Sequence, residues 1–371
     1  MHLERIQLVN FRNYRDEELS FSPGINVFVG NNAQGKTNLL ESVHVLSTSR
    51  SHRAFSDRDL VLWGENAFAI AGTVSTRSIR HQIRIRYDVD AGKDVEIDGK
   101  KVYRSSDLTQ VLAVIVFSPE DLQVVKGSPG MRRRFLDSEL IQINPAYRHA
   151  YREYTKALQH RNSILKGSSA AHHGLDSDLA IWDEQLASHG AKLIELRREA
   201  VQELKVLSAD KYGAVSGGGE ELELAYATSF PCEESSGEEA TKEALLSALA
   251  KTRRESLSRG STVVGPHRDD LAIYVEGQDL RSFGSQGQQR TAILAMKMAM
   301  LEFVERCIDD LPVLLLDDVM SELDEKRRKY LLSVVSNRIQ TFITTTSPDI
   351  GNAISDSPTV YRVENGRAWR C

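Results

Sequence analysis

The stretch Gly30-Asn31-Asn32-Ala33-Gln34-Gly35-Lys36-Thr37 decides the fold class, because it matches the pattern G-x-x-x-x-G-K-[ST] at every defined position. A strand-like run at 25–29 precedes it, and a run with helical apolar spacing follows from Lys36 to Ser47. In this strand–loop–helix context the pattern forms a phosphate-binding loop, or P-loop. The alternative is a chance glycine turn, and a complete match placed between a strand and a helix argues against it.

Every residue of 30–37 is therefore a candidate nucleotide-binding residue. The glycines let the backbone wrap closely around phosphate oxygens, while backbone N–H groups and the helix N-terminus supply partial positive charge. Lys36 is expected to bridge the β- and γ-phosphates, and Thr37 to ligate Mg²⁺. The motif alone fits ATP and GTP equally.

A second acidic site follows the apolar run 313–316, which is typical of a strand buried on both faces of a parallel sheet. Asp317, at the end of this run, is the expected second Mg²⁺ ligand, directly or through water. Asp318 is the candidate catalytic residue, because it can orient or deprotonate an attacking water. The alternative is a pair of acids that only cap the next turn.

The distance along the chain between Lys36 and Asp317 predicts how the domains are arranged. Both belong to one nucleotide site, so the region between them is inserted into a single α/β unit. This plan is similar to that of the ABC-type ATPase heads of SMC and Rad50 proteins. We expect a head from residues 1–118 and 220–371, containing an antiparallel meander at 67–75, 79–89 and 94–98, and a helical insertion at 119–219. Within the insertion, two helices and a loop near 167–174 form an αα-hairpin over about 145–211.

The stretch Ser285-Gln286-Gly287-Gln288-Gln289-Arg290 opens a helical run and resembles the ABC signature, usually written LSGGQ. Ser285, Gly287 and Gln288 are candidate nucleotide-binding residues, because a hydroxyl, a glycine backbone and a helix N-terminus form a second γ-phosphate cradle. In ABC-type heads this cradle serves the ATP of a second subunit, so the resemblance implies an ATP-dependent homodimer. A plain helix cap is the alternative.

Two further segments refine this comparison with ABC heads. Ser321-Glu322-Leu323-Asp324 resembles the D-loop of these proteins, with a helix N-cap as the alternative. The usual switch histidine is missing after the next strand, where 342–346 ends in threonines. Either a threonine takes that role or the γ-phosphate sensor is weaker, so we expect slow hydrolysis and a protein that acts mainly as a switch.

Composition limits the setting in which the chain works. No signal peptide is recognisable, and no apolar run approaches the roughly 20 residues that span a bilayer. The three cysteines are far apart and include no C-x-x-C pair, which favours a reducing, cytoplasmic location without a zinc site. We therefore expect no membrane partner.

The net charge is −5, but the charge is segregated along the chain. Residues 126–166 contain nine Lys and Arg against three Asp and Glu, so a basic surface is possible on an acidic protein. These side chains can contact DNA phosphates without reading sequence; a solvated helix face, or ion pairs that hold the helical region to the head, are the alternatives. The candidates for DNA contact are Arg132, Arg133, Arg148, Arg152, Lys156 and Arg161.

Several stretches together resemble one family, the RecF recombination mediators. They are Leu8–Tyr14, Thr48–Arg53, Pro119–Leu122, Lys126–Pro129, Arg132–Asp137 and Gly265–Leu271, in addition to Asn31–Gln34 within the P-loop and the signature. The resemblance covers the chain from end to end. It implies an ATP- and Mg²⁺-dependent dimer that binds single-stranded or gapped DNA and junctions, and that acts as a weak DNA-dependent ATPase. It also implies work with RecR and RecO in loading recombinase, in replication restart and in SOS induction.

The resemblance to Rad50-like heads further implies that Arg12, just past the first strand, approaches the nucleotide. A plain surface arginine is the alternative. Two other classes share the ATPase motifs. A transporter's nucleotide-binding subunit usually lacks so long an αα-hairpin and needs a membrane partner. A structural SMC-type protein needs a far longer heptad region than this insertion provides.

Overall fold

The computed structural model divides the chain into two compact units, which we call the head unit (Met1–Asp121 and Leu301–Cys371) and the helical unit (Leu122–Met300). The structure describes all residues except 78, 168–174, 235–236, 337 and 348–357. The loop expected near 167–174 therefore lies almost entirely outside the described residues. Among the described helices, none combines the length and apolarity that a bilayer crossing requires.

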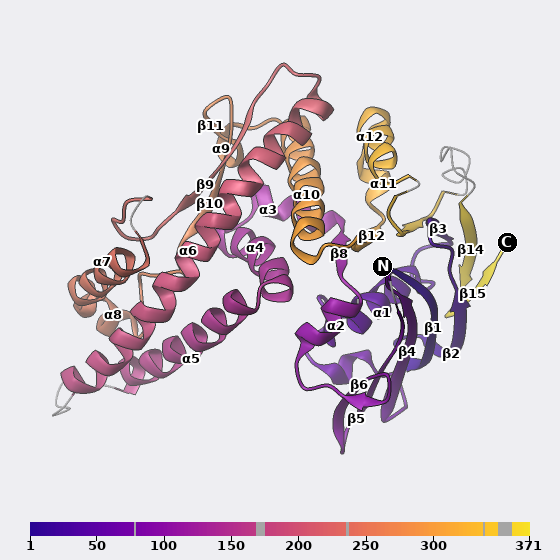
Figure 1. Cartoon of the computed structure of the whole chain (residues 1–371), viewed down its shortest axis with the longest axis horizontal. Coiled ribbons are helices and arrows are strands. Elements are labelled where there is room, and N and C mark those ends of the chain that lie inside the picture. The colour runs from indigo at the N-terminus through magenta and orange to yellow at the C-terminus, as the bar shows by residue number, and fades with distance from the viewer. Residues whose placement is uncertain (78, 168–174, 235–236, 337, 348–357) are drawn as a thin grey trace. The chain divides into compact units, whose positions relative to one another are not determined.

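The head unit draws strands from both ends of the chain, as Figure 1 shows by the indigo β1–β3 and the yellow β14 and β15. One of its sheets has the order β15-β14-β3-β13-β12-β8, in which β14, β3, β13, β12 and β8 are parallel neighbours. The bounds of its strands are β3 (Ile25–Val29), β8 (Val114–Phe117), β12 (Val313–Asp317), β13 (Thr341–Thr345), β14 (Thr359–Glu364) and β15 (Arg367–Arg370). The carboxyl ends of parallel strands meet at one edge, where ligands bind in open α/β sheets.

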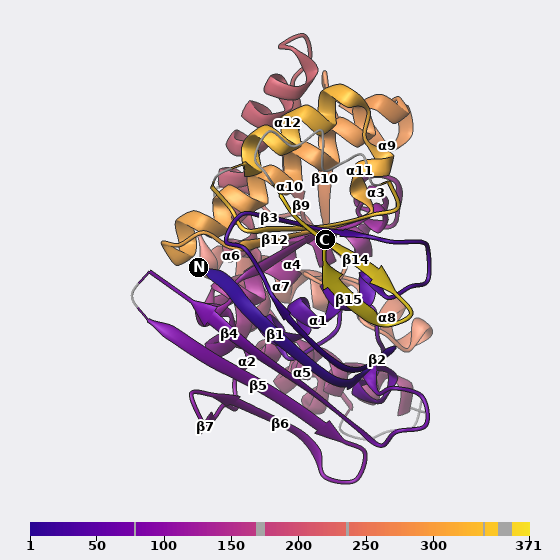
Figure 2. The same ribbon diagram turned by 90° about the vertical axis from the view of Figure 1, so that its right-hand side faces the viewer.

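The second sheet of the head unit is antiparallel, with the order β2-β1-β4-β5-β6-β7 (Figure 2). The expected meander is confirmed as its β4–β6 segment. The strand bounds are β1 (His2–Phe11), β2 (Tyr14–Ser20), β4 (Ala67–Ser75), β5 (Arg80–Asp88), β6 (Gly92–Ile97) and β7 (Lys100–Lys101). Residues alternate between buried and exposed along β4 and β5, so one face of this sheet is apolar and the other polar.

Helix α1 (Lys36–Thr48) packs against strands of both sheets, which places the P-loop helix in the core of the head unit. Leu39, Val43 and Leu46 are buried there, together with Ile70 of β4 and Phe342 of β13. The remaining head helices are η1 (Asp57–Leu60), α2 (Ser105–Val111), η2 (Pro119–Asp121), α11 (Val319–Glu322) and α12 (Glu325–Val335).

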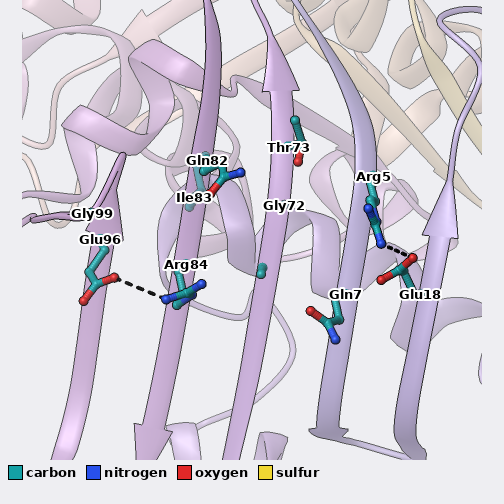
Figure 3. Close-up of a pocket in the computed structure, with 11 residues that line it drawn as sticks. Arg5, Gln7, Glu18, Gly72, Thr73, Gln82, Ile83, Arg84, Glu96 and Gly99 are labelled. Carbon is teal, nitrogen blue, oxygen red and sulfur yellow. Dashed lines mark ion pairs between the residues drawn. The ribbon is translucent and has the colours of Figure 1, made fainter.

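The polar face of the antiparallel sheet carries cross-strand ion pairs around a shallow hollow of about 310 Å³ (Figure 3). Arg5 pairs with Glu18 on one side, and Arg84 lies 3.9 Å from Glu96 on the other. Since each arginine has a carboxylate beside it, the hollow offers no unbalanced charge to a ligand. We interpret it as a solvated sheet face.

In the helical unit, α5 (Pro145–Gly167) and α6 (Leu175–Ser216) contact each other extensively and form the expected αα-hairpin. Tyr147 and Tyr154 of α5 are buried, so these tyrosines pack inside the hairpin rather than offer rings to DNA bases. The other elements of the unit are α3 (Leu122–Lys126), α4 (Pro129–Ile143), α7 (Glu238–Lys251), α8 (Arg253–Arg259), α9 (Leu280–Phe283) and the three-stranded sheet of β9 (Leu222–Ala227), β10 (Asp270–Val275) and β11 (Gln278–Asp279).

The second domain boundary differs from the expected one, because residues 220–300 belong to the helical unit and not to the head. Buried polar contacts explain the difference. Arg197 of α6 donates to both carboxylate oxygens of Asp137, to the carbonyl of Pro266 and to the hydroxyl of Tyr226 in β9. Helix α10 (Gln286–Ile308) then carries the chain from the helical unit into the head unit.

Candidate functional site

The P-loop follows β3 and ends where α1 begins at Lys36. Both of its glycines are required by local geometry. Gly35 has φ 117°, a conformation that side-chain-bearing residues rarely adopt. At Gly30 an added Cβ would lie 2.3 Å from the carbonyl oxygen of Val363 in β14. The strand–loop–helix context expected from the sequence is therefore present in the structure.

The Lys36 side chain folds back over the loop, where its Nζ donates to the carbonyls of Gly30 at 2.6 Å and Asn31 at 2.8 Å. Burial lowers the pKa of this ammonium group, while the nearby carboxylates of Asp318 and Asp317 act in the opposite direction. A phosphate chain in the loop would add negative charge beside this partly desolvated cation, and so favours its protonated form.

Residues from three segments meet at the carboxylate predicted to hold Mg²⁺. The Thr37 hydroxyl donates to Asp317 Oδ1 at 2.9 Å, and the Thr344 hydroxyl donates to the same oxygen at 2.7 Å. The sheet explains the convergence, since Asp317 of β12 is the register partner of Thr344 in β13, and β13 pairs with β3. The structure thus brings together Lys36, Thr37 and Asp317 from opposite ends of the chain.

The donor set at this point fits a magnesium ion. Mg²⁺ takes oxygen ligands at about 2.0–2.1 Å in octahedral geometry, so two adjacent ligands lie roughly 2.9 Å apart. The Thr37 and Asp317 oxygens are 2.9 Å apart. One hydroxyl and one carboxylate leave the other positions to water and phosphate oxygens, as Mg²⁺ prefers.

Asp318, the predicted catalytic residue, is the N-cap of α11 and has φ 53°. Its backbone N–H donates to the Thr344 hydroxyl at 2.9 Å, and its carbonyl accepts from Ser321 at 2.7 Å. Non-glycine residues in this conformation are uncommon and are concentrated at functional sites, although aspartate tolerates it. Thr344 therefore contacts both acids, at the place in the sequence where a switch histidine was expected and not found.

The P-loop and the two acids line a hollow of about 240 Å³. Sequence reasoning missed two of its lining residues, Asn38 of α1 and Arg53 of the loop after α1, whose side chains lie 3.4 Å apart. Arg53 ends the stretch Thr48–Arg53, which resembles the RecF family. That resemblance was the only feature of the sequence that pointed to Arg53. The Arg53 guanidinium adds a second cation, beside Lys36, to the lining of this hollow.

Arg12 lies beside this hollow and forms an ion pair with the buried side chain of Glu41. Its Nε and Nη2 donate to the two carboxylate oxygens of Glu41 at 2.9 and 2.8 Å, and its Nη1 donates to the Asp59 carbonyl. Burial would raise the pKa of Glu41, but hydrogen bonds from Arg12 and Ser51 outweigh it and lower that pKa. Arg12 also lines a second, larger hollow of about 940 Å³, which shares Asn38 and Arg53 with the first.

The signature residues lie in the helical unit, at the start of α10. Ser285 and Gln288 form a reciprocal cap, in which the Gln288 N–H donates to Ser285 Oγ at 3.2 Å and the Ser285 N–H donates to Gln288 Oε1 at 2.9 Å. The cap alternative is thus confirmed, and it leaves the Ser285 O–H available to a ligand. Ser285 and Gln286 are exposed, so the N-terminus of this 23-residue helix faces solvent. Gly287 forms part of its first turn.

The segment resembling a D-loop also contains a helix cap. Asp324 is the N-cap of α12, and its side chain accepts from the backbone N–H of Arg327. Ser321 contacts the carbonyl of Asp318, which links this segment directly to the predicted catalytic residue. The two interpretations of the segment are therefore compatible.

Two of the candidate DNA-contacting arginines are buried and require correction. Arg161 is fully enclosed and donates to Asp183 at 2.6 Å and to the Thr262 hydroxyl at 2.8 Å. Arg132 is 5% exposed and forms a bidentate pair with Asp270. Neither guanidinium is accessible to a phosphate, because each one neutralises a carboxylate inside the helical unit.

The other candidates differ in accessibility. Arg133 is half-buried and donates to the carbonyl of Asp269, whereas Arg152 and Lys156 are exposed on α5. Both exposed cations pair with Glu153, at 2.8 and 3.2 Å. Arg148 lies one turn earlier on the same helix and is half-buried. Arg148, Arg152 and Lys156 follow one another at four-residue steps along α5, and we call them the α5 surface.

His267, in the stretch Gly265–Leu271, has a structural role. Its Nδ1 lies 2.6 Å from the Tyr154 hydroxyl and its Nε2 lies 3.0 Å from the Thr262 carbonyl, which fixes the neutral ring with Nε2 protonated. Burial lowers the pKa of His267 to about 4. Among the described residues, no cluster of His, Cys, Asp and Glu is arranged to hold a metal ion through protein side chains alone.

Comparisons with known proteins agree with this geometry. The family described as "RecF/RecN/SMC N terminal domain" matches residues 2–368. The DNA replication and repair protein RecF of Bacillus cereus strain G9842 is 39% identical over 368 residues, covering 99% of this chain and 98% of that protein. RecF of Bacillus thuringiensis strain Al Hakam is 40% identical over 349 residues, covering 94% and 93% of the two chains.

Solved structures give the same result. A structure of the recombination mediator RecF with ATPrS, described as part of the RecFOR pathway, aligns at a TM-score of 0.92 with 36% identity, covering 100% of this chain and 98% of that one. An Smc head bound to the C-winged helix domain of ScpA aligns at a TM-score of 0.57 with 15% identity, which is a likeness of fold. The α/β fold is therefore that of an ABC- and SMC-like ATPase head with a helical unit, and the chain belongs to the RecF family.

Proposed function

We propose that this chain is an ATP-dependent DNA-binding protein of replication and recombinational repair. The observation that carries the proposal is the convergence of Thr37, Asp317 and Thr344 beside Lys36. In this proposal the P-loop holds the triphosphate, Thr37 and Asp317 hold Mg²⁺, and Asp318 orients the attacking water. RecF relatives solved with ATP and ATPrS support ATP as the nucleotide.

The hollow beside the phosphate site suits the base of that nucleotide. It is lined by Arg12, Asn13, Arg58 and Trp63, and its volume of about 940 Å³ exceeds what a purine needs. Trp63 is 95% exposed, so its indole is available to stack on a planar ring. Because this hollow and the phosphate site share Asn38 and Arg53, one nucleotide can occupy both.

The exposed start of α10 supports the second part of the proposal. Ser285, Gly287 and Gln288 would receive the γ-phosphate of ATP held by a second copy of the chain, so that ATP joins two chains into a homodimer. A helix N-terminus that carries a hydroxyl is a favourable anion site, because the helix dipole places partial positive charge there. Hydrolysis, which we expect to be slow, would then release the pair.

The third part of the proposal concerns DNA and partners. The ATP-joined dimer binds single-stranded or gapped DNA and junctions through basic surfaces that include Arg148, Arg152 and Lys156. It works in the cytoplasm with RecR and RecO to help load recombinase, and in doing so supports replication restart and SOS induction. The RecFOR description of a solved relative supports this assignment of partners.

The experiment that tests this function is DNA binding with and without ATP. Gapped, single-stranded and double-stranded DNA of equal length are titrated with the protein at several salt concentrations. ATP should strengthen binding, with gapped DNA bound most tightly, and the affinity should fall as salt rises. Equal, weak binding to all three DNAs with and without ATP would rule out the proposed function.

A further inference from the structure

Hydrogen bonds from two turns far apart in the sequence converge on Gln34, the residue before the second glycine of the P-loop. The Gln34 carbonyl accepts from the Asn13 side-chain amide at 3.0 Å and from the backbone N–H of Gly366 at 3.0 Å. Its side-chain oxygen accepts from the backbone N–H of Asn365 at 2.8 Å. Asn13 lies in the β1–β2 turn, while Asn365 and Gly366 form the β14–β15 turn.

These contacts fix which way the P-loop amides point. A trans peptide unit is planar, with its carbonyl and its N–H on opposite sides. Holding the Gln34 carbonyl against the two turns therefore directs the N–H of Gly35 away from them. The Gly35 carbonyl is held in the same way by the Tyr14 hydroxyl at 3.0 Å, which orients the N–H of Lys36. Backbone N–H groups in such a loop are the ones that cradle phosphate oxygens.

The β14–β15 turn is built for this close approach. Asn365 has φ 50° and Gly366 has φ 70°, so the turn uses left-handed conformations at both positions. A Cβ added at Gly366 would lie 2.1 Å from the carbonyl oxygen of Asn13. Strand β14 also pairs directly with β3, with Arg362 opposite Val29, so the hairpin is anchored to the strand that leads into the P-loop.

We infer that the C-terminal β14–β15 hairpin is a positioning element of the nucleotide site, and that Asn365 and Gly366, with Asn13, hold the P-loop in its phosphate-binding conformation before the nucleotide arrives. Asn365 and Gly366 need not touch the nucleotide, whereas Asn13 also lines the hollow proposed for its base. All three residues increase the affinity for the nucleotide because the loop amides are already oriented, so less ordering accompanies binding. The inference rests on the proposed binding of ATP at Gly30–Thr37.

The test compares ATP and ADP affinity with the thermal stability of the nucleotide-free protein. Gln34→Ala removes only the side-chain acceptor, and should weaken binding of both nucleotides by roughly fivefold with little change in stability. Gly366→Ala displaces the whole turn, and should weaken binding by roughly tenfold or more. The matched control is Trp369→Ala, in β15 of the same hairpin, which makes none of these contacts and should bind like the wild type.

A double variant separates positioning from general damage. If Gly366→Ala acts through Gln34, then Gln34→Ala combined with Gly366→Ala should bind ATP no more weakly than Gly366→Ala alone. If Gly366→Ala fails to fold, Gln34→Ala and Asn13→Ala decide the question. Wild-type affinity in folded Gln34→Ala and Asn13→Ala would overturn the inference. Failure of the wild-type protein itself to bind ATP would instead overturn the proposed function.

Discussion

The Thr37 hydroxyl donates a hydrogen bond of 2.9 Å to Asp317, although 280 positions separate the two residues in the chain. The first lies at the start of the P-loop helix and the second at the end of a buried parallel strand. Their meeting makes one nucleotide site from both ends of the chain. The metal site, the hydrolysis and the completion by a second copy that are proposed for this site can each be tested by substitution.

Replacing the carboxylate at Asp317 should uncouple Mg²⁺ from nucleotide binding. Asp317→Asn removes a charged metal ligand. It keeps an oxygen that can accept the hydrogen bonds from Thr37 and Thr344. ATP affinity, measured by fluorescence titration with and without Mg²⁺, should lose most of its metal dependence. The control is Asp16→Asn, on the exposed face of β2, in which ATP affinity should keep its dependence on Mg²⁺. An unchanged metal dependence in Asp317→Asn would remove Asp317 from the metal site.

Asp318→Asn should separate ATP binding from hydrolysis. The backbone of residue 318 keeps its contact with Thr344, so the site retains its shape, but the amide cannot accept a proton from water. Removal of a general base typically lowers a rate by roughly 10²–10⁴-fold. Single-turnover hydrolysis should fall accordingly while the ATP-joined dimer persists. Hydrolysis at the wild-type rate would assign the base to another residue.

DNA binding at the α5 surface should depend on Glu153 as well as on the basic side chains of that surface. Because Glu153 pairs with both Arg152 and Lys156, Glu153→Gln should free them and strengthen DNA binding. Arg152→Ala combined with Lys156→Ala should weaken binding and reduce the salt slope by about 0.9 for each lost phosphate contact on duplex DNA. Lys205→Ala provides the control, since Lys205 is also an exposed lysine paired with a glutamate, on α6. If Glu153→Gln, the double variant and Lys205→Ala all change DNA affinity to the same extent, DNA does not bind at the α5 surface.

Acid should destabilise the protein partly through His267. The folded pKa of this ring is about 4 and its ordinary value is 6.5, so between these values the unfolded chain binds a proton that the folded chain does not. The free energy of unfolding should therefore fall as pH falls from 6.5 to 4, by up to about 1.4 kcal/mol per pH unit for this one proton.

Denaturant titrations from pH 7.5 to 4.5 measure this contribution. His267→Gln has no titrating ring and should show a shallower pH dependence than the wild type, although it is less stable at neutral pH. His160→Gln, at an exposed histidine of the same unit, should keep the wild-type slope. Identical slopes in all three proteins would show that His267 is not held neutral.

Much of the head could be predicted because its signals are local. The P-loop motif, the apolar strand before Asp317 and the alternation in 67–75 each specify an element without reference to the rest of the chain. The αα-hairpin was predictable for the same reason, since its apolar stripe repeats along each helix. The family resemblance rested on several such local stretches.

Contacts between distant residues could not be predicted from those patterns. In the sequence, Arg161 and Arg132 look like surface cations on helices. Only the fold shows that both are buried, where they pair with Asp183 and Asp270. The position of residues 220–300 in the helical unit depends on the pairing of β9 with β10 and on Arg197, for which no local pattern exists. The approach of Asn365 to Gln34, 331 positions earlier, is equally invisible in sequence.

The central claim is that ATP held by one copy of the chain is completed by Ser285 of another. Light scattering after size exclusion tests it most directly, with wild type, Ser285→Arg and Lys36→Met measured alone and mixed. ATP should dimerise the wild type and neither variant alone, although Ser285→Arg still binds ATP and Lys36→Met does not. Mixing the two variants with ATP should restore a dimer, since one composite site is then intact. Normal ATP-dependent dimerisation of Ser285→Arg alone would contradict the account.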